Sequence, residues 1–497
     1  MVADHYKDKV RACFIGKNAG GTLGAPLECK RGVWELTGYT DERKGVLPND
    51  DLDLQLVWLN ACEAHGVNVN AEILADYWIA YITGDWSEYG ACKNNLRAGL
   101  LPPFSGMYCN HNKNSCGAFI RSEIWACLMP GNPEKAVRYA LEDAICDHSD
   151  EGVYAEIFCT AVESAAFAEN KIDELIKIGL SYIPEGCAVA KAVKLVCECF
   201  KQNMDWKEAR HKLLTEVPCS FGMYVGYEER EKEDIPVGAL GFDAPANIGI
   251  ILIGWLWGNG DFGKSICISA GCGEDADCTA ATLGSILGII GGSDGIPNMW
   301  QKPIGDEIKT ISVNLTNDVI KIPKTVTELV ERIIELQLIF DGQEFKDLRM
   351  TSYKTGIFSR SCFLEDLEIR MRGIKKENTL LEVILSYDKP EITDTKQIKL
   401  YVRNKLKMQQ WIRVRLYTDD GLELMQGNEC EYCIDQFHGG TAVSTLQTEI
   451  VCNESSRGRY EGVLEITSIG RTEKLYFPIL LINRKVNNKR DGMQKLL

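Results

Sequence analysis

The chain has 497 residues, of which 45% are hydrophobic and 25% charged, with a net charge of −16 and 20 cysteines. This length suits two or more domains, each with its own core. The sequence holds no apolar run of the ~18 residues that a membrane span needs, and the segment after Met1 lacks the apolar region of a secretory signal. We therefore expect a cytoplasmic protein that does not bind membranes, and its scattered cysteines suit buried thiols better than a disulfide framework.

The negative charge is concentrated in the first two thirds of the chain. Residues 1–340 carry 30 Lys and Arg against 48 Asp and Glu, a net charge of −18, whereas residues 341–497 carry 25 against 23, a net charge of +2. An acidic surface argues against a nucleic-acid backbone as partner. It favours a cleft that binds cations, and a phosphorylated substrate would then be held by metal ions and backbone amides.

The first predicted helix covers residues 5–16, and a glycine-rich stretch follows from Gly16 to Gly24. We expect this stretch to be a turn at a crowded helix junction. It shows no GxGxxG pattern after a strand, so we do not predict a dinucleotide-binding fold. Glu28 lies just beyond it, and on sequence alone a surface carboxylate there is unremarkable.

An acidic cluster, Asn49-Asp50-Asp51-Leu52-Asp53, stands at the start of a predicted helix that runs to about Gly66. One helix start needs one capping residue, so three acids and an Asn exceed what capping requires. Further helical patterns occupy residues 71–82, 120–128, 134–148, 153–168, 188–200, 246–257, 261–270 and 325–339. A loop rich in Asn, Gly and Pro spans about 94–115. No strand pattern interrupts these helices, so residues 1–340 are predicted to form an all-α domain.

A second acidic pair, Asp275 and Asp277, lies on a glycine-flanked turn before a run of small and apolar residues. Ala280, Gly284 and Gly288 recur every four residues, which predicts a buried helix that another helix approaches closely. The two acids could simply cap this helix and answer its dipole. Alternatively, they hold a hard cation together with the first cluster. Two carboxylates ~4 Å apart repel by about 4 kcal/mol at an effective dielectric near 20, so convergence of the clusters would imply a cation.

The pattern changes after residue 340. Alternating runs are separated by turn residues, which predicts an antiparallel β-sandwich domain over residues 345–497. The expected strands are 363–370, 380–387, 397–402, 411–417, 441–451, 462–469 and 474–482. Cys430 and Cys433 form a lone CxxC, and a structural zinc site needs four ligands.

Five motifs in order make the chain resemble the ADP-ribosylglycohydrolases, the family that contains the dinitrogenase reductase-activating glycohydrolase. Gly20–Glu28 is similar to the family's GDALGAPVE segment, and Asn49–Leu52 is similar to its TDDT segment. Cys116–Arg121 is similar to GNGxxMR, and Pro130–His148 is similar to PGDPE…DA…TH. The last motif, GGDTDTxAA, is similar to Gly273–Ala281. The resemblance covers roughly residues 8–300. It implies a multidomain α+β protein, with an all-α ADP-ribosylglycohydrolase-like domain before a smaller β-sandwich domain that the resemblance does not cover.

The resemblance also implies a site. Family members bind two Mg²⁺ or Mn²⁺ ions between the two acidic motifs. Carried over residue by residue, the metal ligands are Asn49, Asp50, Asp51, Asp275, Asp277 and Cys278. Glu28 matches the family's acid/base glutamate, with Asp51 as a second catalytic candidate. The matched substrate-binding residues are Cys116, Gly117, Ala118 and His148. A His at a helix end is also favoured by the helix dipole alone. We expect Glu274 to point to solvent.

Three residues depart from the family pattern: Gly21 for Asp, Leu52 for Thr, and Cys278 for a metal-ligating Thr. Sulfur is a soft ligand that suits Mg²⁺ poorly, and Thr279 or Asp53 could supply a replacement oxygen. The expected function is metal-dependent hydrolysis of an N- or O-glycosidic bond of an ADP-ribosyl group or related riboside, free or protein-linked. The alternatives are a catalytically silent protein that binds an ADP-ribose-like ligand, with the sandwich as an interaction module, and a purely structural role for the acids.

Overall fold

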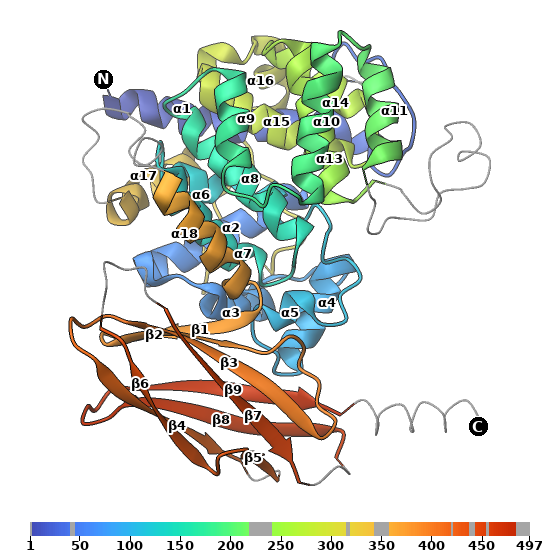
Figure 1. The fold of residues 1–497 in the computed structure, drawn as a ribbon. Helices are drawn as coiled ribbons and strands as arrows, with labels where there is room; N and C mark the ends of the chain where they lie inside the picture. Colours follow the sequence, from blue (N-terminus) through green and yellow to red (C-terminus); the bar gives the residue numbers. More distant parts are fainter. Residues whose placement is uncertain are drawn as a thin grey trace. The chain divides into compact units, whose positions relative to one another are not determined.

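The computed structural model describes residues 2–39, 45–217, 241–314, 319–341, 357–418, 421–436, 443–453 and 457–483. Two compact units make up the chain, one of Met1–Asn94 with Cys109–Leu364 and one of Asn95–Tyr108 with Glu365–Leu497. Helices dominate the first unit and antiparallel strands the second (Figure 1), which confirms the predicted fold class. The predicted boundary at residues 340–345 adjoins a stretch, 342–356, that lies outside the described residues, and it stays a prediction.

Most helices of the first unit fall where the apolar periodicity predicts them. The helices of this unit are α1 (Val2–Gly24), α2 (Asp50–His65), α3 (Ala71–Tyr81), α4 (Ser87–Arg97), α6 (Glu123–Leu128), α7 (Pro133–Ala144), α8 (Glu151–Ala166), α9 (Ile172–Leu180), α10 (Ala188–Lys201), α11 (Trp206–Glu216), α13 (Ala244–Gly258), α14 (Phe262–Gly271), α15 (Ala276–Gly291), α16 (Asn298–Ile304) and α17 (Val326–Asp341). Of these, α4, α9, α11 and α16 have no counterpart among the predicted ranges. Short 3₁₀ helices are η1 (Ala25–Leu27), η2 (Gly66–Asn68), η3 (Phe119–Arg121) and η4 (Ser293–Gly295). Within the described residues, no helix combines the length and apolarity needed to cross a membrane.

The helical unit is built around the contact between α1 and α15, whose backbones touch with no side chain between them. A Cβ atom added to Gly16, Gly20 or Gly24 of α1 would lie 2.1, 2.0 or 2.2 Å from a carbonyl oxygen of α15. The same holds in reverse for Gly284, whose Cβ would lie 2.2 Å from the carbonyl oxygen of Gly16. The small-residue face predicted for α15 therefore does admit a second helix.

The prediction of a turn over Gly16–Gly24 was wrong, because these residues form the last two turns of α1. Glycine normally weakens a helix by about 1 kcal/mol relative to alanine. Here the spacing of four residues places the glycines on one face of α1. Close packing of that face against α15 stabilises the helix and offsets the low helix propensity of glycine. The chain turns away only at η1, where Pro26 stands in the first turn.

The remaining helices surround this pair. In Figure 1, α10, α11, α13 and α14 lie next to one another, and α13 contacts each of the other three. Helix α13 is apolar on all sides and almost wholly buried, so it is a core helix of the unit. The start of α17 is capped by Thr325, whose hydroxyl accepts a hydrogen bond from the backbone N–H of Glu328 at 3.1 Å.

The predicted first strand, residues 363–370, was also wrong: it belongs to helix α18 (Ile357–Arg370). Phe363 and Leu367 are buried while Glu365 and Glu368 are exposed. A spacing of four between buried residues is helical, whereas a strand would bury every second residue. The buried positions in this mixed apolar and acidic run therefore show that its periodicity is that of a helix.

The second unit contains two antiparallel sheets. Its elements are the short helix α5 (Phe104–Met107) and the strands β1 (Gly373–Glu377), β2 (Leu381–Ser386), β3 (Thr395–Asn404), β4 (Gln410–Tyr417), β5 (Leu422–Leu424), β6 (Glu429–Ile434), β7 (Ser444–Cys452), β8 (Arg459–Ser468) and β9 (Lys474–Ile482). The strand orders are β1-β2-β3-β7-β5 and β6-β4-β8-β9. Three short strands, β1, β5 and β6, escaped prediction. Residues 441 and 442 of the expected strand 441–451 lie outside the described residues.

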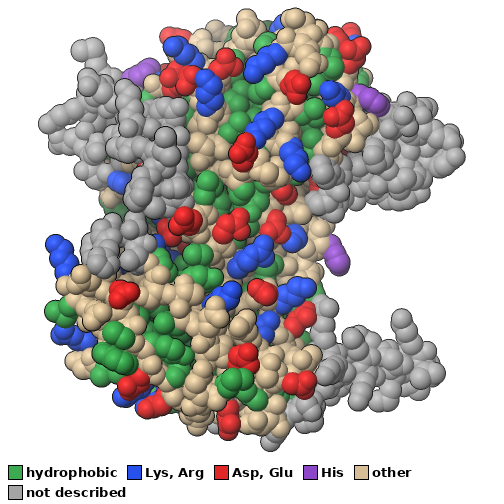
Figure 2. Space-filling view, in the orientation of Figure 1, with side chains coloured by type: hydrophobic (Ala, Val, Ile, Leu, Met, Phe, Trp, Pro, Cys, Tyr) green, Lys and Arg blue, Asp and Glu red, His purple; other side chains and the backbone are tan. Residues whose placement is uncertain are grey.

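Alternate residues of both sheets share one apolar core, which makes the unit a β-sandwich. Val383 pairs with Val402 in one sheet and Val414 with Ile466 in the other, and all four are buried. The ring of Phe104, from α5, stacks on Tyr387 with centroids 4.4 Å apart. Basic and acidic side chains are interspersed over the surface in view (Figure 2).

The contact between α1 and α15 makes a stability prediction. Gly20→Ala should lower the free energy of unfolding by about 1–3 kcal/mol, because the new methyl group overlaps the carbonyl of Ala280. Gly291→Ala, at the end of α15 with no atom within 4 Å of the added Cβ, should be neutral or raise it by up to about 1 kcal/mol. Chemical denaturation of both variants is the measurement, and equal effects would contradict the close-packing account.

Candidate metal centre and active site

Helix capping does not account for the acids at the two helix starts. The cap of α2 is Asn49, whose Oδ1 accepts a hydrogen bond from the backbone N–H of Asp51 at 2.8 Å. Asp275 occupies the cap position of α15, but its side chain makes no capping hydrogen bond. The carboxylates of Asp51 and Asp275 are therefore available for another purpose.

Three overlapping groups of ligand atoms bring the acidic segments together. They are Glu28 with Asp275 and Asp277, Asp51 with Asp277 and Cys278, and Cys116 with Asp275 and Cys278. Within each group, one ligand atom per residue lies within 4.8 Å of the others. Residues from the start of α2, the loop after α1, the start of α15 and the segment before η3 thus converge on one place.

The converging carboxylates are buried and incompletely paired. Asp51, Asp275 and Asp277 are at most 5% exposed. One oxygen of each, Asp51 Oδ2, Asp275 Oδ1 and Asp277 Oδ1, has no hydrogen-bond partner among the described residues. The nearby Lys17 ammonium lies 2.8 Å from Glu123, which it pairs with directly. Buried unpaired anions are costly, so this arrangement calls for a bound cation.

The pKa values of these acids also indicate that their negative charges are buried unfavourably. Burial, followed by the charges of neighbouring carboxylates, raises the pKa of Asp277 well above its usual range. Burial also raises the pKa of Asp51 well above its usual range, and it raises the pKa of Asp275 to about 7. Either a cation or a proton would relieve this repulsion, so cation binding and protonation would compete at the site.

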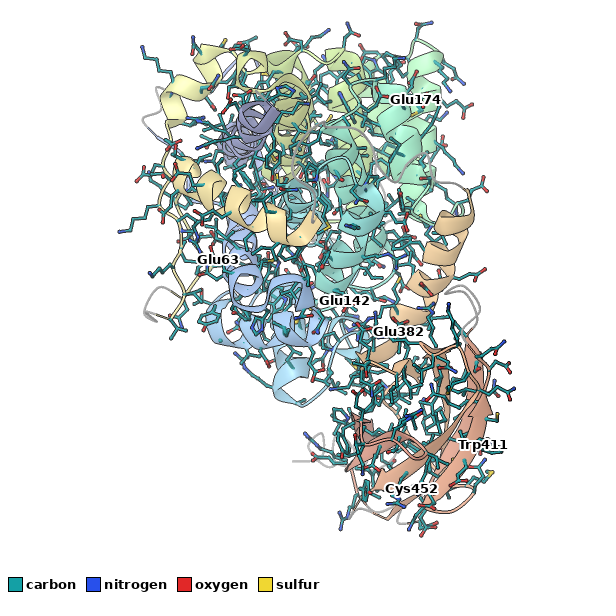
Figure 3. The ribbon with its side chains drawn as sticks, turned by 90° about the vertical axis from the view of Figure 1, so that its left-hand side faces the viewer. Glu63, Glu142, Glu174, Glu382, Trp411 and Cys452 are labelled. Carbon is teal, nitrogen blue, oxygen red and sulfur yellow. The ribbon has the colours of Figure 1, made fainter. Side chains whose placement is uncertain are left out.

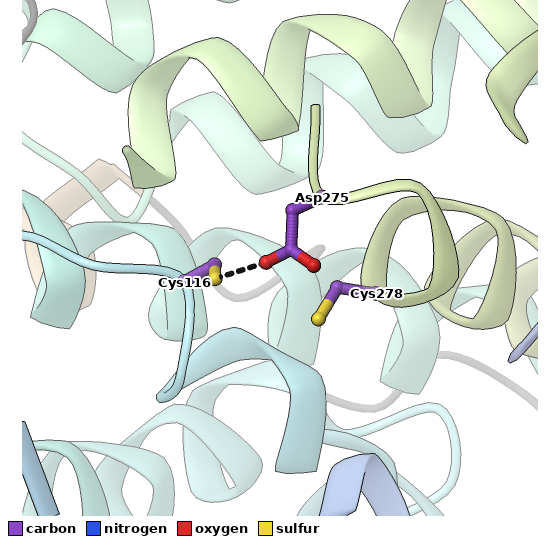
Figure 4. A group of neighbouring side chains, drawn as sticks. All are labelled: Cys116, Asp275 and Cys278. Carbon is purple, nitrogen blue, oxygen red and sulfur yellow. Dashed lines mark hydrogen bonds between the residues drawn. The ribbon is translucent and has the colours of Figure 1, made fainter. Parts of the chain in front are cut away.

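Two thiols complete the site. Cys116 Sγ donates to Asp275 Oδ2 at 2.5 Å, and Cys278 Sγ donates to Asp51 Oδ1 at 3.3 Å. Figure 4 shows the Asp275 carboxylate between the two sulfur atoms, with Cys278 on the first turn of α15. The backbone N–H of Cys116 donates to the carbonyl of Phe242 at 2.9 Å, which fixes the segment before η3. Cys116, predicted to contact substrate, therefore lies among the possible metal ligands.

The donor set only partly fits Mg²⁺ or Mn²⁺. The group of Glu28, Asp275 and Asp277 offers oxygen alone, as hard cations prefer. The group of Cys116, Asp275 and Cys278 offers two sulfur atoms and one carboxylate, which suits softer metals. One position of the site thus fits the expected ions and the other does not.

Glu28 is the solvent-exposed member of the site, and backbone and side-chain contacts with Glu274 hold its loop in place. Although the residue is exposed overall, partial desolvation of its carboxyl group by the surrounding atoms, and then the charge of Asp50, raise the pKa of Glu28. The loop is held by two backbone hydrogen bonds of 3.0 Å: the N–H of Cys29 donates to the carbonyl of Glu274, and the N–H of Glu274 donates to the carbonyl of Lys30. Arg31 donates to both carboxylate oxygens of Glu274, at 2.7 and 2.8 Å.

The expectation that Glu274 points to solvent was wrong. Its side chain is buried, and besides Arg31 it accepts from Arg210 at 3.4 Å and from the backbone of Gly241 at 2.7 Å. The sequence carries little signal for this ion pair, because Arg31 and Glu274 are far apart along the chain. The adjoining Gly273 gives a hint, since both it and Glu274 have a positive φ and form a tight turn.

Several other predicted residues have different surroundings from those expected. Asn49 uses its oxygen as a helix cap and directs its amide nitrogen toward Asp277, 3.5 Å away. Asp50 belongs to none of the three ligand groups. Both proposed replacement residues make hydrogen bonds elsewhere. Asp53 Oδ2 accepts from the backbone N–H groups of Ile311 and Ser312, and the Thr279 hydroxyl donates to the carbonyl of Ala276.

His148 lies in a separate buried network. Its Nε2 is 2.9 Å from the Ser115 hydroxyl and its Nδ1 is 2.9 Å from Asp147. The missing side chain of Gly117 leaves room for the carboxylate of Glu88, which would lie 2.2 Å from an added Cβ. Ala118 is fully buried. This network adjoins Cys116 in sequence, so it supports the segment that carries the thiol.

The Glu274 ion pair predicts a large stability effect. Glu274→Gln keeps the shape but leaves Arg31 buried without its counter-charge, so the free energy of unfolding should fall by about 3–5 kcal/mol. Glu174→Gln is the matched control, because Glu174 pairs with Lys177 at the surface (Figure 3) and its loss should change little. Similar midpoints in urea for both variants would contradict the anchoring role.

The raised pKa of Asp275 predicts how metal-free stability depends on pH. The unfolded carboxyl titrates near ~3.9 and the folded one at about 7. The unfolded state therefore loses its proton first, and stability falls as pH rises through this window. Thermal unfolding in chelator should show a decreasing Tm between pH 5 and 8, and Asp275→Asn should flatten the slope. An unchanged slope in the variant would assign the effect elsewhere.

A comparison with curated proteins gave no match. Among solved structures, one described as an "ADP-ribosylglycohydrolase-related protein complex" is 17% identical, with a TM-score of 0.40, and the alignment covers 68% of this chain and 99% of that one. A model of the ADP-ribosylglycohydrolase family matches residues 3–336, well over half of the chain. The chain therefore belongs to the ADP-ribosylglycohydrolase family.

Proposed function

We propose that this chain is a metal-dependent hydrolase that cleaves an N- or O-glycosidic bond of an ADP-ribosyl group or a related riboside. The observation that carries the proposal is the convergence of Glu28 with the buried Asp275 and Asp277, beside oxygens that lack partners. Family membership supports a glycohydrolase-type reaction. The substrate is a small molecule or a protein that carries ADP-ribose.

The charge of the site suits this reaction. Cleavage of a riboside passes through a state with oxocarbenium character, and nearby carboxylates stabilise its positive charge. When bound, Mg²⁺ or Mn²⁺ supplies Lewis acidity and orients hydroxyl groups. Asp275 and Asp277 would hold that ion, and Asp51, which shares a ligand group with Asp277, lies beside them at the start of α2. A diphosphate would otherwise be repelled by these acids, so ion binding must accompany substrate binding.

Glu28 is the residue proposed to move the proton. It is exposed, so it can reach both substrate and solvent, and its carboxylate lies within 4.8 Å of ligand oxygens of Asp275 and Asp277. A general acid–base works best with a pKa close to the working pH, and the pKa of Glu28 is raised in that direction. The buried Asp51 remains a second candidate for this role.

The test is Glu28→Gln, assayed by release of ADP-ribose from an ADP-ribosylated protein and of ribose from simpler ribosides. Turnover should fall ~10²–10⁴-fold, as is typical when a general acid–base group is lost, while Mn²⁺ binding is retained. Asp275→Asn is the contrasting variant and should lose Mn²⁺ binding as well as turnover.

The outcomes separate the roles. If Glu28→Gln weakens Mn²⁺ binding in proportion to turnover, Glu28 is a ligand and the proton passes to Asp51. Absence of turnover by the unaltered protein on every riboside, with Mn²⁺ bound, would overturn the proposed hydrolysis.

A further inference from the structure

The ligand groups of the site are chemically unlike one another. One offers three carboxylates, from Glu28, Asp275 and Asp277, and another offers Cys116, Cys278 and a single carboxylate from Asp275. Asp275 is common to both. Its two oxygens also differ: Oδ2 accepts from Cys116, and Oδ1 is buried without a partner among the described residues.

Both thiols are placed as ligands of a shared ion would be. Cys116 is 5% exposed and Cys278 is 7% exposed, and neither is in a disulfide. They come from segments far apart in sequence, yet their sulfur atoms lie within 4.8 Å of each other and of an Asp275 oxygen (Figure 4). Cys278 stands in the first turn of α15, and Cys116 lies in the segment before η3.

The chemistry of sulfur decides which ion fits. Zn²⁺ is bound in proteins by thiolate, imidazole and carboxylate groups in tetrahedral sites, and three protein ligands leave a fourth position open. Mg²⁺ requires oxygen ligands in octahedral geometry and has little affinity for sulfur. Cys116, Cys278 and Asp275 supply three negative charges once the thiols lose their protons, which offsets the charge of a zinc ion.

We propose that the site has two unlike metal positions that share Asp275: a sulfur position, formed by Cys116, Asp275 and Cys278, that selects Zn²⁺, and an oxygen position, formed by Asp275 and Asp277 beside Glu28, that takes Mg²⁺ or Mn²⁺. The oxygen position rests on the proposed function, whereas the sulfur position rests on the donor set alone. Zinc binding would release one proton from each thiol to solvent, since thiolates are the ligands.

The experiment uses Co²⁺ as a spectroscopic substitute for Zn²⁺. Metal-depleted full-length protein, kept reduced, is titrated with Co²⁺ and followed by absorption. A sulfur-to-cobalt charge-transfer band in the near ultraviolet is expected, and it should disappear when Zn²⁺ is added but persist with excess Mg²⁺. No such band in the unaltered protein would overturn the sulfur position without recourse to any variant.

Substitutions then assign the ligands. Cys116→Ser and Cys278→Ser should each weaken Zn²⁺ binding by more than the ~10–100-fold cost of an outer-shell change, and each should reduce the cobalt band. Cys267→Ser is the matched control, since Cys267 is similarly buried at 6% exposure but belongs to α14 and to none of the ligand groups. Circular dichroism confirms that each variant is folded before its affinity is compared.

Measurements with Mn²⁺ separate this proposal from the proposed function. Electron paramagnetic resonance should detect Mn²⁺ bound to the Cys116→Ser variant with unchanged affinity. Zinc affinity that both cysteine variants leave unaltered would overturn the sulfur position, even if ribosides are hydrolysed with Mn²⁺. Conversely, a cobalt band with no turnover on any riboside would preserve the sulfur position and overturn the proposed hydrolysis.

Discussion

The structure of the site depends on the contact between α1 and α15. Gly16, Gly20 and Gly24 bring the two backbones together so closely that even a methyl group would overlap a carbonyl of α15. This contact fixes the first turn of α15, which carries Asp277 and Cys278, against the end of α1, from which the loop with Glu28 departs. Candidate ligands separated by some 250 residues along the chain are thereby held within a few ångströms by packing rather than by loop structure.

This packing must offset an electrostatic cost. Carboxylates about 4 Å apart repel by about 4 kcal/mol at an effective dielectric near 20, and the buried Asp51, Asp275 and Asp277 share one small region. Burial, and then the charges of neighbouring carboxylates, raise the pKa values of these acids, so protonation relieves part of the cost in the absence of a cation. The ion pair of Glu274 with Arg31 lies directly beside this region and keeps the acidic turn and the Glu28 loop together. The scaffold therefore holds together a site whose own charges favour separation.

Local sequence patterns predicted much of this arrangement. Helical periodicity located most helices of the first unit, and alternation located most strands of the second, because both signals reflect which residues are buried. The same rules failed where the sequence does not indicate which residues are buried. The glycines of α1 read as a turn because glycine is a weak helix former, and only the position of α15 explains them as helix. Residues 363–370 read as a strand until the burial of Phe363 and Leu367 revealed a spacing of four.

The site was predictable to the extent that its residues lie in recognisable motifs. Asp51, Asp275, Asp277 and Cys278 were named as ligands from the two acidic helix starts and the family resemblance, and the structure brings them together. Long-range pairing was beyond the sequence: nothing near Glu274 identifies Arg31 as its partner, and nothing near Cys116 identifies Cys278. A short motif specifies which side chains a segment offers, whereas the identity of their neighbours is a property of the packed fold.

Cys278 is an example of a residue whose chemical effect depends on a neighbour from another part of the chain, in this case Cys116. Threonine and cysteine are similar in size, so the family's usual residue and this one fit the same place at the start of α15. Had Cys278 lacked a second sulfur nearby, it would simply weaken a site for hard ions, because one soft ligand adds little to Mg²⁺ or Mn²⁺ binding. Cys116 lies within reach of it and of Asp275, so the substitution changes the kind of ion that the position prefers. The oxygen ligands on the other side of Asp275 are unaffected, and a single carboxylate therefore joins two positions of different chemistry.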